Sequence, residues 1–315
     1  MRAARLHQFG QSPVIDEIDI PSREPGQSLI KIDAAALGHL DITIASGTFD
    51  IRPQLPHTGG THGSATVVDS DTIAPGTRVL VRGDGVGLFR NGCWAEYLVT
   101  SDKALTPYDP NLSPAVAATF SLPTATGYVA VHDIAGVVQG ERVIVSGASG
   151  AVGSMAAQFA LLARAAEVIG VVPRADQTAL LPDGVRPVVG RGDDVAAALG
   201  TEPVAEVLID TLGGDVLPQL LQRVTPGGRA VLIGYTLGRT LTLDLPNWLL
   251  SDVQLLPLNM MRKTARQAEL APEMIRRLAA GELTLAIQEF ALDDIASGLQ
   301  LMQEGKLTGR AVLVP

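Results

Sequence analysis

The pattern of apolar and polar residues predicts a β-rich first third of the chain. Residues 28–34 alternate apolar and polar side chains, as a half-buried strand does, and short β-branched runs follow at 66–68, 78–81 and 96–100. Proline and glycine separate the early segments, as they do in turns. We therefore expect antiparallel strands with tight connections in this part.

From about residue 142, nearly continuous apolar runs alternate with helical segments, as strands buried on both faces alternate with their connecting helices. One helix is expected over 153–166, where Met155, Phe159 and Leu162 share a face, and another over 215–224. This alternation predicts a doubly wound parallel sheet. Its expected strands are 143–145, 168–172, 207–209 and 230–233.

The segments on either side of this region have helix signals of their own. A cap residue, a proline at the first helical position or a terminal glycine marks their ends. The expected elements are a helix over 114–120 capped by Ser113, a helix over 265–280 ended by Gly281, a helix over 293–303 capped by Asp293, and a last strand over 311–314.

The first buried strand runs into a glycine-rich turn with the spacing G-x-x-G-x-x-G, and a helix follows. The first glycine permits a tight turn, the second lets the backbone approach a pyrophosphate, and the third allows close helix–strand packing. The turn therefore predicts a dinucleotide site. Its expected contact residues are Gly147, Ser149, Gly150, Ala151, Val152 and Gly153.

The end of the second buried strand bears on the choice of coenzyme. An NAD site usually has an acidic residue there, to bind the ribose 2′-hydroxyl. The strand over 168–172 is followed instead by Pro173 and Arg174, with Asp176 close by. Because arginine binds a phosphate by charge-assisted hydrogen bonds, the sequence favours NADPH over NADH.

The amino-acid composition limits the kinds of molecule that the protein is expected to bind. With 24 Lys+Arg against 33 Asp+Glu, the chain carries a net charge of −9, and only 4% of its residues are aromatic, which disfavours nucleic acid. A single cysteine, Cys93, excludes an internal disulfide framework and a zinc site with several thiolates. No apolar stretch reaches membrane-spanning length. We expect a soluble cytoplasmic protein with a small-molecule substrate.

Seven segments in chain order give the sequence a resemblance to the medium-chain dehydrogenase/reductase superfamily, within it to the zinc-independent quinone oxidoreductase branch. They are ALGHLD at 36–41, GTHGS at 60–64, GCWAEY at 92–97, LPTATGY at 122–128, DTLGG at 210–214, GGRAVLIG at 227–234 and GKLTGRAVL at 305–313.

The resemblance implies a Rossmann-type NADP-binding domain at residues 115–264, inserted in a discontinuous GroES-like catalytic domain at 1–114 and 265–315. The substrate would enter the cleft between them. It also implies a homodimer formed through the edge of the cofactor sheet. Further coenzyme contacts are implied at Leu212, Gly234, Tyr235 and Asn259.

The sequence departs from its zinc-dependent relatives at the metal ligands. Gly38 and Thr61 stand where those proteins have Cys and His, and neither replaces a thiolate or an imidazole. A remnant site built from His39 and His62 is the alternative to no metal at all. The quinone oxidoreductase branch favours Asn and Glu at positions 38 and 62, so the substrate pocket has been remodelled as well.

Without a Lewis acid, reduction of a polarised acceptor is favoured over alcohol oxidation. The resemblance places Thr126 beside the nicotinamide and Asp41 in the pocket motif, while His39 and His62 are candidate proton donors. We expect an NADPH-dependent reductase of quinones or α,β-unsaturated carbonyls. The alternatives are a 2-enoyl thioester reductase, which would use Arg262, Lys263 and Arg266, and a non-catalytic nucleotide-binding sensor or partner protein.

Overall fold

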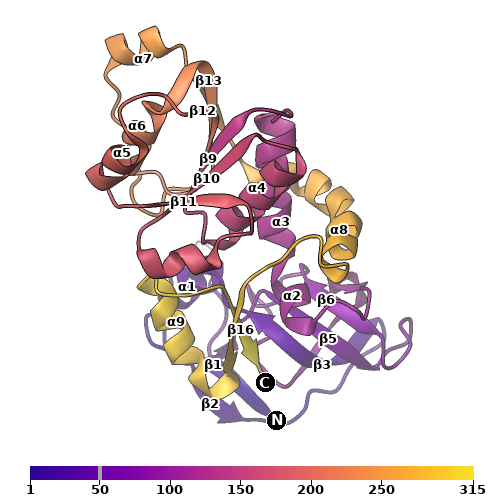
Figure 1. Cartoon of the computed structure of the whole chain (residues 1–315). Coiled ribbons are helices and arrows are strands. Elements are labelled where there is room, and N and C mark those ends of the chain that lie inside the picture. Colours follow the sequence, from indigo (N-terminus) through magenta and orange to yellow (C-terminus); the bar gives the residue numbers. More distant parts are fainter. Residues whose placement is uncertain (49–51) are drawn as a thin grey trace. The chain divides into compact units, whose positions relative to one another are not determined.

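The computed structural model describes residues 1–48 and 52–315. They form two compact units. Unit 1 comprises residues 1–121, 275–282 and 286–315, and unit 2 comprises residues 122–274 and 283–285. Both chain termini lie in unit 1 (Figure 1). The predicted domain boundaries near residues 114 and 264 stay predictions.

Unit 2 is built on a six-stranded sheet in which every neighbouring pair is parallel, with the strand order β11-β10-β9-β12-β13-β14. In chain order this is 3-2-1-4-5-6, the order of a dinucleotide-binding sheet. The predicted doubly wound sheet is thereby confirmed. Its strands are β9 (Arg142–Ser146), β10 (Glu167–Val172), β11 (Val185–Val189), β12 (Ala205–Asp210), β13 (Val224–Leu232) and β14 (Gln254–Pro257).

Helices cover both faces of this sheet, α4 on one and α5 and α6 on the other (Figure 1). Apolar side chains fill the layers between them; Ile144, Ile169 and Leu208 in the middle strands are completely buried. The remaining elements of unit 2 are α3 (Ser121–Tyr128), a π-helical turn (Val129–Ile134), α4 (Ala151–Leu162), the 3-10 helix η3 (Ala175–Leu180), α5 (Asp193–Leu199), α6 (Val216–Leu221), α7 (Leu245–Ser251) and the 3-10 helix η4 (Met260–Lys263).

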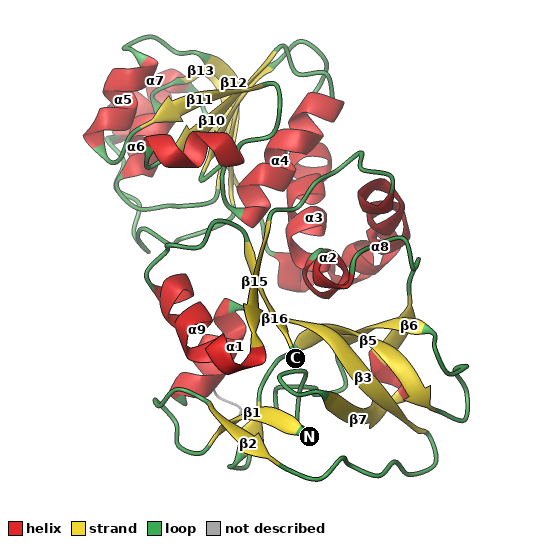
Figure 2. Cartoon of the chain, turned by 60° about the horizontal axis from the view of Figure 1, so that its bottom comes forward, coloured by secondary structure: helices red, strands yellow, loops and turns green. Residues whose placement is uncertain are grey.

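Unit 1 is β-rich. One sheet has the order β15-β16-β3-β5-β6-β8, with β7 also paired to β3, and a smaller sheet has the order β2-β1-β4. Figure 2 shows β15 and β16 side by side; they form a parallel pair. The strands are β1 (Arg2–Leu6), β2 (Val14–Glu17), β3 (Gln27–Ala36), β4 (His57–Thr58), β5 (His62–Asp69), β6 (Arg78–Arg82), β7 (Tyr97–Ser101), β8 (Leu105–Pro107), β15 (Ile287–Ala291) and β16 (Arg310–Val314).

The remaining α-helices of the described residues are α1 (His39–Ser46), α2 (Pro114–Thr119), α8 (Thr264–Ala279), which runs from unit 2 into unit 1, and α9 (Ile295–Gln303). Two short 3-10 helices, η1 (Asp102–Ala104) and η5 (Leu292–Asp294), lie in unit 1. The Ser113 hydroxyl caps α2 by accepting a hydrogen bond from the Val116 N–H, as predicted. Among the described residues, no helix is long and apolar enough to cross a membrane.

Two local predictions were wrong. Leu162 is 46% exposed although Met155 and Phe159 on the same face are buried, because Leu162 is the last residue of α4 and no further turn covers it. Asp293 does not cap α9. A 3-10 turn precedes that helix, and the Asp293 carboxylate instead accepts a hydrogen bond from Arg2.

Candidate active site

The residues predicted to bind a coenzyme all follow the carboxyl ends of strands in unit 2. In an open parallel sheet these ends lie along one edge, where ligands bind at the point of strand-order reversal. The reversal here falls between β9 and β12, which are neighbours in the sheet. The predicted residues follow β9 (Gly147 and the turn), β10 (Arg174), β12 (Leu212), β13 (Gly234, Tyr235) and β14 (Asn259).

The glycine turn leaves no room for side chains at its two ends. Gly147 has φ +60°, and a Cβ atom there would lie 2.6 Å from Thr211 Oγ1. A Cβ atom on Gly153 would collide with the Gly147 carbonyl oxygen. Gly150, between them, is exposed and is the N-cap of α4, so its side of the turn is open to a ligand. The turn fits the close backbone approach that a pyrophosphate requires.

A buried polar network holds this turn from beneath. The Ser146 hydroxyl donates to Asp210 Oδ1 at 2.6 Å and accepts from the Thr211 N–H at 2.8 Å. The other carboxylate oxygen of Asp210 accepts the Gly213 N–H at 2.8 Å. Burial raises the pKa of Asp210, although these hydrogen bonds act in the opposite direction. The network ties the carboxyl ends of β9 and β12 together.

The other coenzyme candidates form the rest of this edge. A Cβ atom on Gly234 would collide with the Thr211 carbonyl oxygen, so the β12 and β13 ends touch through backbone. Leu212 accepts the Leu237 N–H at 2.9 Å. Tyr235 is 66% exposed. Asn259 uses its side-chain oxygen to cap η4, since it accepts the Met261 N–H at 3.0 Å.

Arg174 is paired with a carboxylate. Its Nε lies 3.0 Å from Asp176 Oδ1 and its Nη2 lies 3.2 Å from Asp176 Oδ2, a two-pronged contact. The following residue, Gln177, accepts a hydrogen bond from the Ser149 hydroxyl at 3.3 Å. That bond connects η3, which follows Arg174, to the glycine turn.

Thr126 lies in α3 and is buried. Its hydroxyl donates to the Leu122 carbonyl oxygen, one turn earlier, at 2.7 Å. Because the hydroxyl donates its proton within the helix, its oxygen can only accept a hydrogen bond from a ligand.

In unit 1, Asp41 joins the two segments that carry metal ligands in zinc-dependent relatives. Its Oδ2 accepts the Gly38 N–H at 2.9 Å and its Oδ1 accepts the Thr61 N–H at 3.0 Å. Asp41 is buried on the first turn of α1, and burial raises its pKa to about 6. The structure thus brings Asp41, Gly38 and Thr61 together.

The two candidate proton donors lie near this carboxylate. His62 Nδ1 is 3.0 Å from the Thr61 hydroxyl, and burial, with the charges of Arg82 and Arg310, lowers the pKa of His62 to about 4. His39 is the first residue of α1, and burial of its ring lowers its pKa as well. His62 is therefore a neutral imidazole at pH 7.

Arg310 is the residue that our sequence analysis missed. Its Nε atom is buried and has no hydrogen-bond partner among the described residues. Burial lowers its pKa, and the charge of Asp41 acts against that shift. Nothing in the sequence indicates that an arginine at the start of a strand is buried, although Arg310 lies in the family-like segment 305–313. Arg310 places a positive charge among Asp41, His39 and His62.

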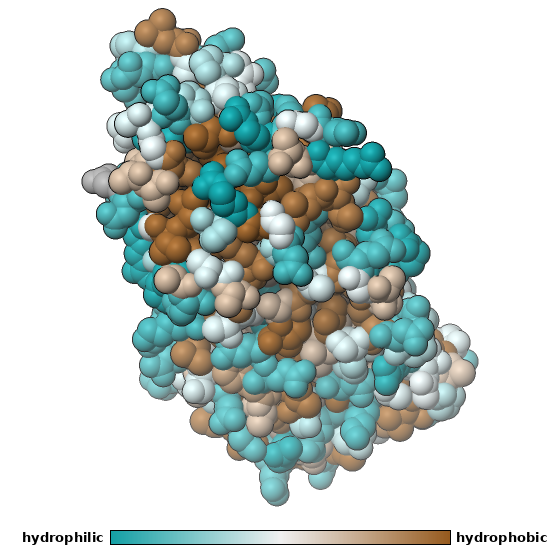
Figure 3. Space-filling model, in the orientation of Figure 1, coloured by the Kyte–Doolittle hydropathy of each residue, from teal (hydrophilic) through white to brown (hydrophobic). Residues whose placement is uncertain are grey.

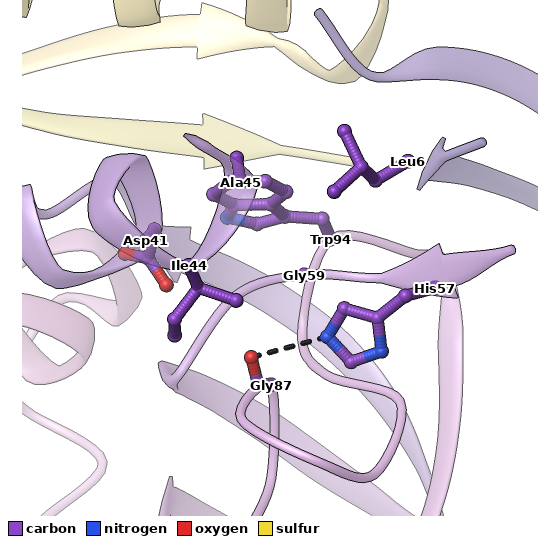
Figure 4. A pocket seen from close by; sticks show the side chains of 8 residues that line it. All are labelled: Leu6, Asp41, Ile44, Ala45, His57, Gly59, Gly87 and Trp94. Atoms are coloured by element: carbon purple, nitrogen blue, oxygen red, sulfur yellow. Dashed lines mark hydrogen bonds between the residues drawn. The ribbon is translucent and has the colours of Figure 1, made fainter. Parts of the chain in front are cut away.

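Figure 4 shows a small cavity behind Asp41. Asp41 and Ile44 project from α1 toward it, and His57 donates to the Gly87 carbonyl oxygen at 3.2 Å on another side. Its volume of about 10 Å³ suffices for one water molecule. The cavity is therefore too small for an organic substrate.

Over residues 1–48 and 52–315, no three or more His, Cys, Asp or Glu side chains gather closely enough to hold a metal ion. Cys93 is buried beside Gly63 and burial raises the pKa of its thiol, so it offers no thiolate. Gly38 and Thr61, whose N–H groups Asp41 accepts, supply neither the thiolate nor the imidazole that zinc takes as ligands.

Two family models match the chain. The model for the alcohol dehydrogenase GroES-like domain matches residues 24–110, and the model for the zinc-binding dehydrogenase matches residues 151–280. The chain is 30% identical to the quinone oxidoreductase of Lama guanicoe over 244 residues, which cover 74% of the chain and 73% of that protein.

Similarity also extends over the full length. The alcohol dehydrogenase of Geobacillus stearothermophilus is 26% identical over 99% of the chain and 98% of its own length. A solved NAD-dependent alcohol dehydrogenase superposes with a TM-score of 0.82 at 25% identity, covering both chains completely. The chain is therefore an oxidoreductase that belongs to the medium-chain dehydrogenase/reductase superfamily, among its quinone oxidoreductase-like members.

Proposed function

We propose that the chain is an NADPH-dependent, zinc-independent reductase that transfers hydride to a quinone or to an α,β-unsaturated carbonyl. The observation that carries this proposal is the Asp41 contact. Where zinc-dependent relatives place a thiolate and an imidazole, this chain has Gly38 and Thr61, and Asp41 accepts the backbone N–H of both. These two positions are thus fixed by hydrogen bonds and hold no metal ligand.

The coenzyme half of the site would be the strand edge of unit 2. The glycine turn would hold the pyrophosphate, and Arg174 would hold the 2′-phosphate by charge-assisted hydrogen bonds. When bound there, the reduced nicotinamide supplies a hydride. Gly234 and Tyr235 follow β13, the neighbour of β12 in the sheet, and would contact the nicotinamide portion, Gly234 through its backbone.

A hydride and one proton convert a quinone into a hydroquinone, or an α,β-unsaturated carbonyl into its saturated form. The side chains described above are poor sources of that proton at pH 7. His62 has its pKa lowered to about 4, and the Thr126 hydroxyl donates within its own helix. We therefore assign proton delivery to water. The positive charge of Arg310 would stabilise negative charge that develops on the acceptor oxygen.

Asp41 would act as a positioning residue. It touches backbone N–H groups and is buried, so its contribution is to hold Gly38 and Thr61 in place. The imidazole of His39, which is partly buried and partly open to solvent, stands at the start of the same helix and is a candidate for contact with the acceptor.

The thioester reductase alternative needs cations to bind a carrier phosphate, and one of its three candidates is already occupied. Arg266 pairs with Asp133 and Glu269 at 2.9 and 2.8 Å, which leaves Arg262 and Lys263. The sensor alternative would retain the glycine turn and lack turnover. Neither has an observation in its favour that the reductase lacks.

We also propose that the enzyme is a homodimer. β14 is the outer strand of the unit 2 sheet, so its free edge can pair with a second copy. Nearby in sequence, α7 exposes Leu249 (69%) and Leu250 (82%), and Figure 3 shows the apolar surface at its end. Sedimentation velocity with a charged variant, Leu250→Glu, tests this, since the charge should shift a dimer toward monomer.

An acceptor screen tests the function itself. Purified protein with NADPH would be offered a 1,4-quinone, an enone and a crotonyl thioester, and NADPH oxidation would be followed by absorbance. We expect turnover of the quinone or the enone. Faster turnover of the thioester would favour the thioester reductase, and binding of NADPH without turnover of any acceptor would favour the sensor.

A further inference from the structure

The Arg174–Asp176 pair has the geometry of a guanidinium bound to an oxyanion. Nε and Nη2 of Arg174 face the two carboxylate oxygens of Asp176, at 3.0 and 3.2 Å. Carboxylates and phosphates engage the arginine fork in the same bidentate manner. The carboxylate of Asp176 therefore occupies the edge of Arg174 that a phosphate would use.

By its position after β10, the pair stands where the adenosine ribose of a bound dinucleotide would lie. Arg174 comes two residues after β10, whose neighbour β9 leads into the glycine turn. The hydrogen bond from Ser149 to Gln177 links that turn to the segment directly after Asp176. In such sheets an acidic residue at this position binds the ribose 2′-hydroxyl, and an arginine accommodates a 2′-phosphate.

We propose that Asp176 is a specificity-determining residue that limits the preference for NADPH by competing for Arg174; the inference rests on the coenzyme assignment above. To bind NADPH, the 2′-phosphate has to displace Asp176 from Arg174 and then lies beside the displaced carboxylate. To bind NADH, the pair stays intact and the outer lone pairs of Asp176 accept the ribose 2′-hydroxyl. The same ion pair thus takes part in binding either coenzyme and sets the ratio of the NADPH and NADH affinities.

The test compares NADPH and NADH affinities by nicotinamide fluorescence in four proteins: wild type, Arg174→Ala, Asp176→Asn and Asp183→Asn. Asp183 is an exposed carboxylate just before β11, so its replacement makes the same change in net charge at the opposite ends of the strands. We expect Asp176→Asn to tighten NADPH binding about fivefold and to leave NADH binding equal or weaker, because the change frees the Arg174 guanidinium and removes a like charge from beside the 2′-phosphate. Asp183→Asn should change neither.

The outcomes separate the two proposals. If Arg174→Ala weakens NADPH binding and Asp176→Asn leaves the ratio of the two affinities unchanged, the role of Asp176 is overturned and the coenzyme assignment stands. If Arg174→Ala leaves NADPH binding unchanged, the coenzyme assignment fails and this inference fails with it. An equal gain for Asp183→Asn would show a long-range effect of net charge and would also overturn the inference.

Discussion

Ser146 and Asp210 lie 64 residues apart in the chain, and the serine hydroxyl donates to the buried carboxylate at 2.6 Å. The bond joins β9, which leads into the glycine turn, to β12, which leads into Leu212 and Gly213. Because Asp210 also accepts the Gly213 N–H, one buried carboxylate holds both loops that we assign to the coenzyme.

Replacing Ser146 by Ala should therefore lower both stability and coenzyme affinity. The change leaves Asp210 Oδ1 and the Thr211 N–H without their hydrogen-bond partner. Each unsatisfied buried group costs about 1–3 kcal/mol of folding free energy. Urea unfolding and NADPH titration measure the two effects. Ser251→Ala is a suitable control, because that hydroxyl only donates to the Trp248 carbonyl oxygen at the end of α7. Equal losses of stability in the two variants would contradict the role given to Ser146.

The lowered pKa of His62 predicts that the folded protein loses stability in acid. Its pKa is about 4 in the folded protein against a usual 6.5, so the unfolded chain takes up a proton first as the pH falls. The stability that it contributes is complete above about pH 6.5 and is lost on the way down to pH 4. His62→Gln removes this effect, so the stability of the variant relative to wild type should rise by about 2 kcal/mol between pH 7.5 and 4.5. Urea unfolding at both pH values measures it, and a constant difference would contradict the prediction.

For Asp41 we expect the opposite dependence of folding stability on pH. Its pKa is raised to about 6 from 3.8, so the folded protein holds this proton at a pH where the unfolded chain has released it. The contribution is complete below about pH 3.8 and is lost as the pH rises through 6. Relative to Asp41→Asn, the wild type should lose about 2 kcal/mol between pH 4.5 and 7.5. A wild type that gained stability relative to the variant over this range would show that the carboxylate is not destabilised by burial.

Asp41→Asn also tests positioning against a purely structural role. The amide that replaces one carboxylate oxygen cannot accept the N–H of Gly38 or Thr61, so one of the two segments is released. We expect a higher KM for the acceptor with unchanged affinity for NADPH. A loss of NADPH affinity of the same size would indicate a general loss of structure instead.

Sequence patterns predicted the elements well where the cause is local. Continuous apolar runs predicted β9, β10 and β12, and Ser113 predicted the start of α2, because burial of a strand and capping of a helix depend on neighbouring residues. The same reasoning failed at Asp293, where an ion pair with Arg2, at the other end of the chain, takes the side chain that a local cap would use.

The candidate site was predictable in its residue types and less so in its contacts. Glycine spacing predicted the tight turn that the structure shows, and Arg174 predicted an anion-binding position, which stays a prediction. The partners of these groups come from tertiary structure: neither the burial of Arg310 nor the contact between Ser146 and Asp210 follows from any periodic pattern. Asp176 is the intermediate case, since its proximity to Arg174 was evident in the sequence and its two-pronged contact was not.

The most direct test of the central claim is hydride transfer by metal-stripped protein. NADPH deuterated at C4 would be mixed with a 1,4-quinone or an enone after exhaustive dialysis against a chelator, with residual zinc measured by mass spectrometry. Because Gly38 and Thr61 supply no metal ligand, we predict one NADPH oxidised per acceptor reduced, at a rate that chelator and added zinc leave unchanged. Activity that vanishes on chelation and returns with zinc would contradict the account.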